Sequence, residues 1–109
     1  MAFTYKVLGQ SAPSATTNTD IYTVGAEKQA IISTLVVCNR SSSIRTYRIA
    51  VRPAGATLAN QHYIAYDVTV GASDSTNLSL GMTLGPADVV TVYASTTDLS
   101  FTLFGSESS

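Results

Sequence analysis

The stretch that decides the fold is "RTYRIAVRPAGATLANQHYIAYDVTV", residues 45–70. In residues 45–52 apolar and polar side chains alternate, and a period of two is typical of a strand with one buried face. Pro53 and Gly55 then end the run and predict a loop. Residues 62–70 alternate again. The stretch is therefore expected to form two strands, with inner faces made by Tyr47, Ile49 and Val51 and by Ile64, Tyr66, Val68 and Val70.

Short alternating segments of this kind recur along the whole chain, separated by polar turns. Runs with the 3.6-residue period of a helix are missing, and β-branched residues are frequent. This pattern predicts an all-β fold: a single-domain antiparallel β-sandwich over residues 1–109, of jelly-roll or Greek-key type, with about eight strands. Residues 10–19 are polar, so residues 1–20 are expected to include an extended N-terminal arm that orders on contact with a partner.

The most apolar segment is "AIISTLVVCN", residues 30–39, which is expected to be a central strand covered on both faces. Alternation would place Ala30, Ile32, Val36 and Cys38 together on one of these faces. Residues 77–84 predict a strand with Leu78, Leu80, Met82 and Leu84 on one side, and residues 106–109 a polar tail. The expected core comprises Val36, Cys38, Ile49, Val51, Val68, Val92 and Phe101.

The chain carries few charges. Charged residues make up 12% of the sequence and the net charge is −1. Without a basic excess the chain cannot neutralise many phosphates, which argues against a nucleic-acid partner. No apolar run approaches the roughly 20 residues of a membrane-spanning helix, and the first ten residues lack the pattern of a signal peptide. A surface poor in charge is suited to contact with other chains, because few charges would lose their water.

The sequence offers little for catalysis. Cys38 is the single cysteine, so it cannot form an internal disulfide, and its apolar surroundings are a poor place for a nucleophile. His62, the single histidine, is expected to hydrogen-bond a backbone group at the end of a loop. Phosphate-binding and hydrolase motifs are missing, and zinc would need more Cys and His ligands. No enzyme activity, cofactor or metal site is expected; a calcium site built from Asp74, Asp88 or Asp98 is the alternative.

Two arginines are expected to share the outer face of one strand. Arg48 and Arg52 are four residues apart, and Asp67 faces outward on the next expected strand. One interpretation is a cross-strand ion pair worth a few tenths of a kcal/mol. The other is a protein interface made by Arg48, Arg52, Tyr63 and Asp67, because arginine and tyrosine are enriched where chains meet. The residues alone do not decide between them.

Four long blocks carry a family resemblance: "MAFTYKVLGQSAPSATTNTDIYTV", "STLVVCNRSSS", "TYRIAVRPAGATLANQHYIAYD" and "DVVTVYASTTDLSFTLFGSE". Together they resemble a family of small virion structural proteins of tailed phages, cyanophages in particular. The resemblance covers essentially the whole chain, although "GAEK" at residues 25–28 departs from the expected turn. It implies a non-enzymatic part of the virion, made in the cytoplasm of the bacterial host.

The resemblance implies several roles within such a particle. The first is a capsid decoration or cement protein, a homo-oligomer, expected as a trimer, that binds the major capsid protein or other virion proteins. The second is a component of the tail, fibre or baseplate, such as an adaptor. A carbohydrate-binding module that uses Tyr63, Tyr66 or Tyr93 is a third class, although the chain has no tryptophan for sugar stacking.

Overall fold

The computed structural model describes residues 2–108, with the exception of the side chain of Leu80. Two short 3-10 turns, η1 (Pro53–Gly55) and η2 (Asn60–His62), connect the fourth and fifth strands. Within the described residues, no helix has the length and apolar character needed to cross a membrane. The strands are β1 (Phe3–Ser11), β2 (Thr19–Thr23), β3 (Ala30–Asn39), β4 (Arg45–Arg52), β5 (Tyr63–Val70), β6 (Ser75–Leu84), β7 (Val89–Ala94) and β8 (Leu99–Ser108).

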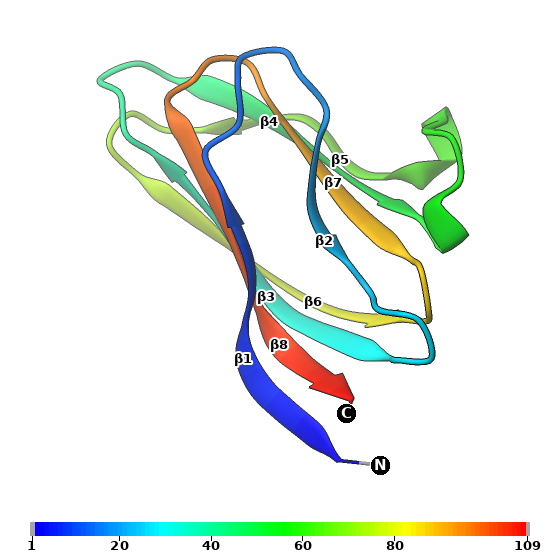
Figure 1. Cartoon of the computed structure of the whole chain (residues 1–109). Coiled ribbons are helices and arrows are strands. Elements are labelled where there is room, and N and C mark those ends of the chain that lie inside the picture. Colours follow the sequence, from blue (N-terminus) through cyan, green and yellow to red (C-terminus); the bar gives the residue numbers. More distant parts are fainter. Residues whose placement is uncertain (1, 109) are drawn as a thin grey trace.

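The strands form two four-stranded antiparallel sheets that pack face to face (Figure 1). The order is β1-β8-β3-β6 in the first, here called sheet A, and β2-β7-β4-β5 in the second, sheet B. Strands from the two halves of the chain alternate within each sheet, which is the strand order of a jelly roll. The structure confirms the expected all-β sandwich and supplies the strand order that the sequence left open.

The core lies between the inner faces of the two sheets. Ile49, Val92 and Phe101, three of the expected core residues, are almost fully buried there. Phe101 of sheet A meets Tyr47 of sheet B edge to face, with ring centroids 6.3 Å apart. Val51 is only partly buried and packs against the rim of this core. The alternation in residues 45–52 therefore predicts the inner face of β4 correctly.

The facing expected for β3 is wrong after its first three residues. A register shift between Ile32 and Thr34 adds one residue, Ser33, to β3 relative to β8, whereas relative to β6 the extra residue lies in β6, between Ser79 and Met82. Such a bulge moves every later side chain to the opposite face. Leu35 and Val37 therefore enter the core, whereas the expected core residues Val36 and Cys38 are only half-buried and face outward.

The expected facing of β5 is also wrong in its middle. Ile64, Tyr66 and Val68 are 50%, 55% and 38% exposed, and only Val70 of the expected inner face is buried. The pairing of β5 with β4 shifts register twice, and Asp67 takes a left-handed φ of 51° that short polar side chains tolerate. Val68 is therefore not a core residue.

The bulges of sheet A lie in one row. The shift in β1 between Val7 and Gly9 is level with that in β3, and the pairing of β3 with β6 shifts at the same height, beside Gly81. Bulges bend a strand and increase its twist. Sheet A accordingly curves away from sheet B at the end where β1 begins and β8 ends (Figure 1).

Both ends of the described chain are more ordered than the sequence predicts. Residues 106–108, expected in a polar tail, belong to β8, and Ser109 lies outside the described residues. Nine of the twenty residues of the segment expected to include an N-terminal arm belong to β1, and the Thr16 N–H donates to the Ala94 carbonyl oxygen at 2.8 Å. In β6 the residues Leu78, Met82 and Leu84 pair with inward-facing residues of β3, as expected. The side chain of Leu80 lies outside the described residues.

Glu107 joins the two sheets at their diverging end. The Tyr22 hydroxyl of sheet B donates to Glu107 Oε2 at 2.5 Å, and Lys6 Nζ and Lys28 Nζ lie 3.1 and 3.9 Å from Oε1. The hydrogen bond from Tyr22, then that from Lys6, lowers the pKa of the Glu107 carboxyl. Burial of the Tyr22 phenol, followed by its bond to Glu107, raises the pKa of Tyr22. The carboxylate is therefore held in its charged form.

Replacement of Glu107 by Gln is expected to make the protein less sensitive to acid. The folded pKa of Glu107 is lowered, so its contribution is complete above the unfolded pKa of about 4.3 and is lost as the pH falls through the folded value. Glu107→Gln should cost about 1–3 kcal/mol at pH 7, in the range for a hydrogen-bonded charge, and less at pH 3. Urea unfolding at the two pH values measures this difference. An equal loss of stability at both pH values would show that the charge of the Glu107 carboxylate is not the source of the effect.

Candidate functional site

The outer face of sheet A exposes a group of large apolar side chains. Register and alternation place on this face the first residues of β1, the start of β3 and the middle of β8. The exposed apolar side chains there are Phe3, Tyr5, Val7, Ile31 and Phe104, and Tyr5 is 86% exposed. Their neighbours on the same face are serine, threonine, asparagine and glutamine, or half-buried Val36 and Cys38.

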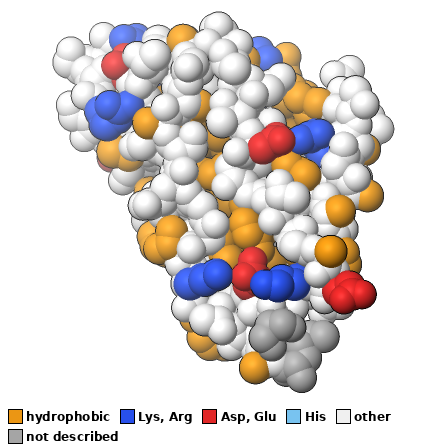
Figure 2. Space-filling model, in the orientation of Figure 1, with side chains coloured by type: hydrophobic (Ala, Val, Ile, Leu, Met, Phe, Trp, Pro, Cys, Tyr) orange, Lys and Arg blue, Asp and Glu red, His pale blue; other side chains and the backbone are white. Residues whose placement is uncertain are grey.

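Among the described residues, none of the six basic and seven acidic side chains of the chain belongs to this outer face. Lys6 and Glu107, the charged residues of β1 and β8, alternate to the inner side and pair with each other. The other charges lie in sheet B and in the turns. On the side where β1 and β2 lie in front, Figure 2 shows basic and acidic groups gathered into a few clusters that contain both signs of charge. We call the outer surface of sheet A the uncharged face.

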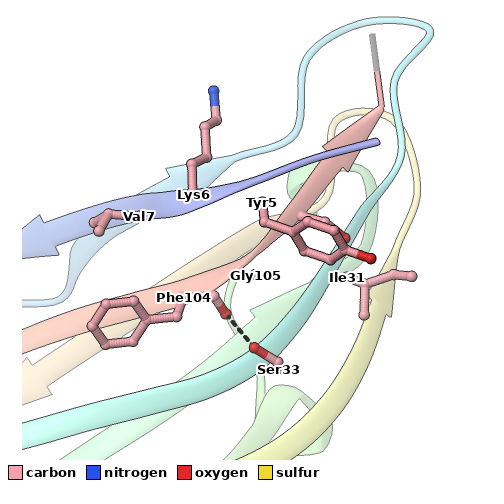
Figure 3. A pocket seen from close by; sticks show the side chains of 8 residues that line it. Tyr5, Lys6, Val7, Ile31, Ser33, Phe104 and Gly105 are labelled. Atoms are coloured by element: carbon pink, nitrogen blue, oxygen red, sulfur yellow. Dashed lines mark hydrogen bonds between the residues drawn. The ribbon is translucent and has the colours of Figure 1, made fainter. Parts of the chain in front are cut away.

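A hollow of about 580 Å³ opens on the uncharged face. Figure 3 shows Tyr5 of β1 reaching over β8 toward Ile31 of β3, with Phe104 farther along β8 on the side of Val7 and Lys6 pointing away. Its floor includes Gly105, where a Cβ atom would collide with the Ile31 carbonyl oxygen. The Ser33 hydroxyl donates to the Phe104 carbonyl oxygen at 3.1 Å and so satisfies backbone at the bulge. The hollow is mostly apolar and open, and Lys6 is the one charged residue among those that line it.

The outer face of sheet B is different, because it carries an arginine between two tyrosines. The Arg48 guanidinium carbon lies 4.1 Å from the ring centroid of Tyr66 and 4.2 Å from that of Tyr93. Its Nε donates to Asp67 at 2.6 Å, and this bond raises the pKa of Arg48. Tyr63 packs edge to face on Tyr66, with centroids 4.9 Å apart. Three of the four expected interface residues, Arg48, Tyr63 and Asp67, are thus brought together.

Arg52, the fourth expected interface residue, belongs to a separate network. Its Nη2 donates to Asp20 at 2.9 Å and its Nε donates to the Thr91 hydroxyl at 3.1 Å. Its Nη1 donates to the carbonyl oxygens of Gly55 and Ala56 in the β4–β5 connection. All three guanidinium nitrogens of Arg52 therefore bind within the chain, and the side chain ties β2, β7 and the connection to β4.

Replacement of Arg48 by Ala is expected to leave the isolated fold almost unchanged. The Arg48–Asp67 pair is solvent-accessible, and such a pair contributes at most about 1 kcal/mol to stability. A pre-ordered arginine between aromatic rings is, in contrast, the type of residue that dominates binding at interfaces. Thermal unfolding measures the loss of stability, and a loss of several kcal/mol would show that the cluster supports the fold.

The remaining candidates are structural. Nδ1 of the buried His62 accepts the Ala59 N–H at 3.0 Å, which confirms the expected bond to the backbone. Of the calcium candidates, Asp88 accepts the N–H groups of Ala54 and Gly85, and the bonds from Thr96 and then Arg45 lower the pKa of Asp98. Within residues 2–108, no group of three or more His, Cys, Asp or Glu side chains is placed to hold a metal ion.

Sequence reasoning missed the uncharged face. The signal was present in "FTYKV", residues 3–7, where large apolar residues alternate with Thr4 and Lys6. Alternation alone does not say which side is the inner one.

Searches of family models, curated proteins and solved structures find no match to this chain.

Proposed function

We propose that this chain is a non-enzymatic structural protein of a phage particle, which decorates the capsid and docks on the shell through the uncharged face. The observation that carries the proposal is the segregation of charge: one sheet face is uncharged and exposes five large apolar side chains. All charged side chains of the described chain lie elsewhere.

Segregation of this kind supports a protein partner. Burial of a charge costs several kcal/mol unless it finds a partner, whereas the uncharged face can be covered without that cost. Large contiguous apolar patches with a polar rim are uncommon on monomers and mark contact sites. A matching surface should be apolar at its centre and rich in hydroxyl and amide groups around it, because the rim of the face carries serine, threonine and asparagine.

The virion role is supported by the sequence resemblance and is compatible with the fold. Jelly rolls occur in viral capsid proteins, in lectins and in cupins, so the architecture alone does not select one of them. A protein that binds the assembled shell but not its free subunits stabilises the shell by mass action. The expected trimer and the major capsid protein as partner belong to the same proposal.

The number of copies per particle tests the location. Quantitative mass spectrometry of purified particles should find hundreds of copies of a decoration protein. A copy number near six or twelve, found in tail fractions that lack heads, would move the protein to the tail, fibre or baseplate and contradict the capsid role.

The face itself is tested by a matched pair of variants. Ile31 on the uncharged face is 40% exposed and Ile64 on β5 is 50% exposed. Ile31→Lys should lower binding to particles at least about tenfold, because the ammonium group would have to be desolvated, whereas Ile64→Lys should bind as the unchanged protein does. Sedimentation of each variant together with particles that lack the protein measures how much of the variant binds. Equal binding by the two variants would show that another surface makes the contact.

A further inference from the structure

The edge of sheet A at β1 is open over residues Phe3 to Val7. β1 pairs with β8 on one side, and within the described residues no strand pairs with its other side. β2 comes close to β1 at Gly9, where a Cβ atom would collide with the Ile21 carbonyl oxygen. The open part of the edge is therefore about 17 Å long, at 3.4 Å per residue.

We propose that a second copy of this chain pairs with the open edge, β1 against β1 in antiparallel orientation, about a two-fold axis at Tyr5. The two four-stranded sheets would then join into one continuous eight-stranded sheet. The inference goes beyond the proposed function and does not depend on it, since it requires only this chain.

The register follows from the side chains of β1. An axis at Tyr5 sets Tyr5 opposite its own copy and Phe3 opposite Val7 of the second chain, so aromatic and β-branched residues pair on the uncharged face. Such cross-strand pairs are favourable. On the opposite side, Lys6 then lies opposite Thr4. An axis at Lys6 would instead oppose two ammonium groups, which is unfavourable.

The open edge lacks the usual devices that prevent pairing. Natural edges are protected by proline, by bulges or by free charges that point along the edge. The stretch from Phe3 to Val7 contains no proline, its pairing with β8 is regular, and its one charge, Lys6, is engaged by Glu107.

The other three sheet edges are less suitable. β5 shifts register twice, β2 is only five residues long and shifts register after Asp20, and β6 is interrupted beside Gly81. A regular, two-fold symmetric pairing is therefore favoured at β1.

The contact is small. A five-residue edge buries less than the roughly 800 Å² per partner of a stable interface, so the dimer should be weak in dilute solution. Pairing would, however, place two uncharged faces side by side on one surface, and two linked sites bind a repetitive shell more tightly than one. A two-fold contact closes on itself, so it would link pairs of chains and could not by itself build the trimer expected from the sequence.

Cysteine cross-linking tests both the contact and its register. In a Cys38→Ser background, Tyr5→Cys should form a disulfide with its own copy under mild oxidation, because directly opposite Cβ atoms lie about 4.5–5.5 Å apart. When the Phe3→Cys and Val7→Cys variants are mixed, they should cross-link with each other. The yield of disulfide-linked dimer should be higher than for either variant alone. Thr4→Cys, which would lie opposite Lys6, is the matched control and should stay largely monomeric.

Sedimentation supplies an independent measurement on a folded variant. The protein should associate to a dimer with rising concentration, and Tyr5→Lys should weaken this association at least about tenfold, because two added ammonium groups would meet at the axis. Since Tyr5 is almost fully exposed, the fold should tolerate the change. Two results would overturn the proposal. One is a protein that stays monomeric at millimolar concentration while the thiol of the Tyr5→Cys variant stays unreacted, and the other is stronger cross-linking through Thr4→Cys than through Tyr5→Cys.

Discussion

Ile49→Ala is expected to lower the free energy of unfolding by about 2–5 kcal/mol, the range for removal of a large aliphatic side chain from a packed core. Ile49 has no measurable exposure and lies in β4 between Val92 of β7 and Ala65 of β5. The surrounding strands are held in two sheets, so they can collapse only partly into the space that the substitution leaves. Urea unfolding at constant temperature measures the loss.

Val36→Ala is the matched control for this prediction. Val36 is in the most apolar segment of the sequence, yet the bulge at Ser33 turns it outward and leaves it half-buried. Its truncation should cost less than about 1 kcal/mol, because few contacts are lost and no closed cavity forms. A loss at Val36 as large as that at Ile49 would contradict the facing of β3 after the bulge.

Gly105→Ala is expected to lower the free energy of unfolding by about 3 kcal/mol, although it adds only a methyl group. The new Cβ would collide with the Ile31 carbonyl oxygen and would lie 3.1 Å from the Ile32 Cα. Both are backbone atoms of the neighbouring strand, so no side chain can rotate out of the way and the two strands must separate. Thermal and urea unfolding should both report the change.

Gly71→Ala provides the comparison. A Cβ at Gly71 would lie 3.7 Å from the Asp74 carboxylate, which is an ordinary contact. Because Ala also restricts the unfolded chain, this substitution should be within about 1 kcal/mol of neutral. A similar loss for both variants would mean that glycine is needed at these positions for a reason other than close strand packing.

The sequence predicts the facing of a strand well where its pattern of apolar and polar residues has only one interpretation. Residues 45–52 alternate apolar and polar side chains, so the inner position of Ile49 follows directly. In residues 30–39 both sides of the strand are apolar, and a one-residue bulge at Ser33 leaves no trace in the pattern. Asp67 is similar, since an aspartate within a strand does not by itself indicate a left-handed backbone. The class of fold was therefore predictable, whereas the facing of β3 and β5 was not.

The candidate site was predictable in the same uneven way. A cross-strand ion pair of Arg48 and Asp67 was one of two interpretations of the sequence, and the structure contains this pair. The two tyrosines around Arg48 come from β5 and β7, and only the strand order brings them together. Prediction of the uncharged face from the sequence is harder than prediction of the Arg48 cluster. It requires the strand order, which places Tyr5 of β1 and Ile31 of β3 on either side of β8.

The place of β8 in sheet A has a consequence for the synthesis of the protein on the ribosome. β8 follows the other seven strands in the chain, yet it lies between β1 and β3 in the middle of the sheet. At about 5–20 residues per second, β1 waits for several seconds before its hydrogen-bonding partner has been synthesised. During this time the nascent chain exposes two unpaired edges, and such long-range pairing closes slowly, on a scale of about milliseconds to seconds. Synthesis in a crowded cell would therefore favour chaperones that shield these edges until the last strand inserts.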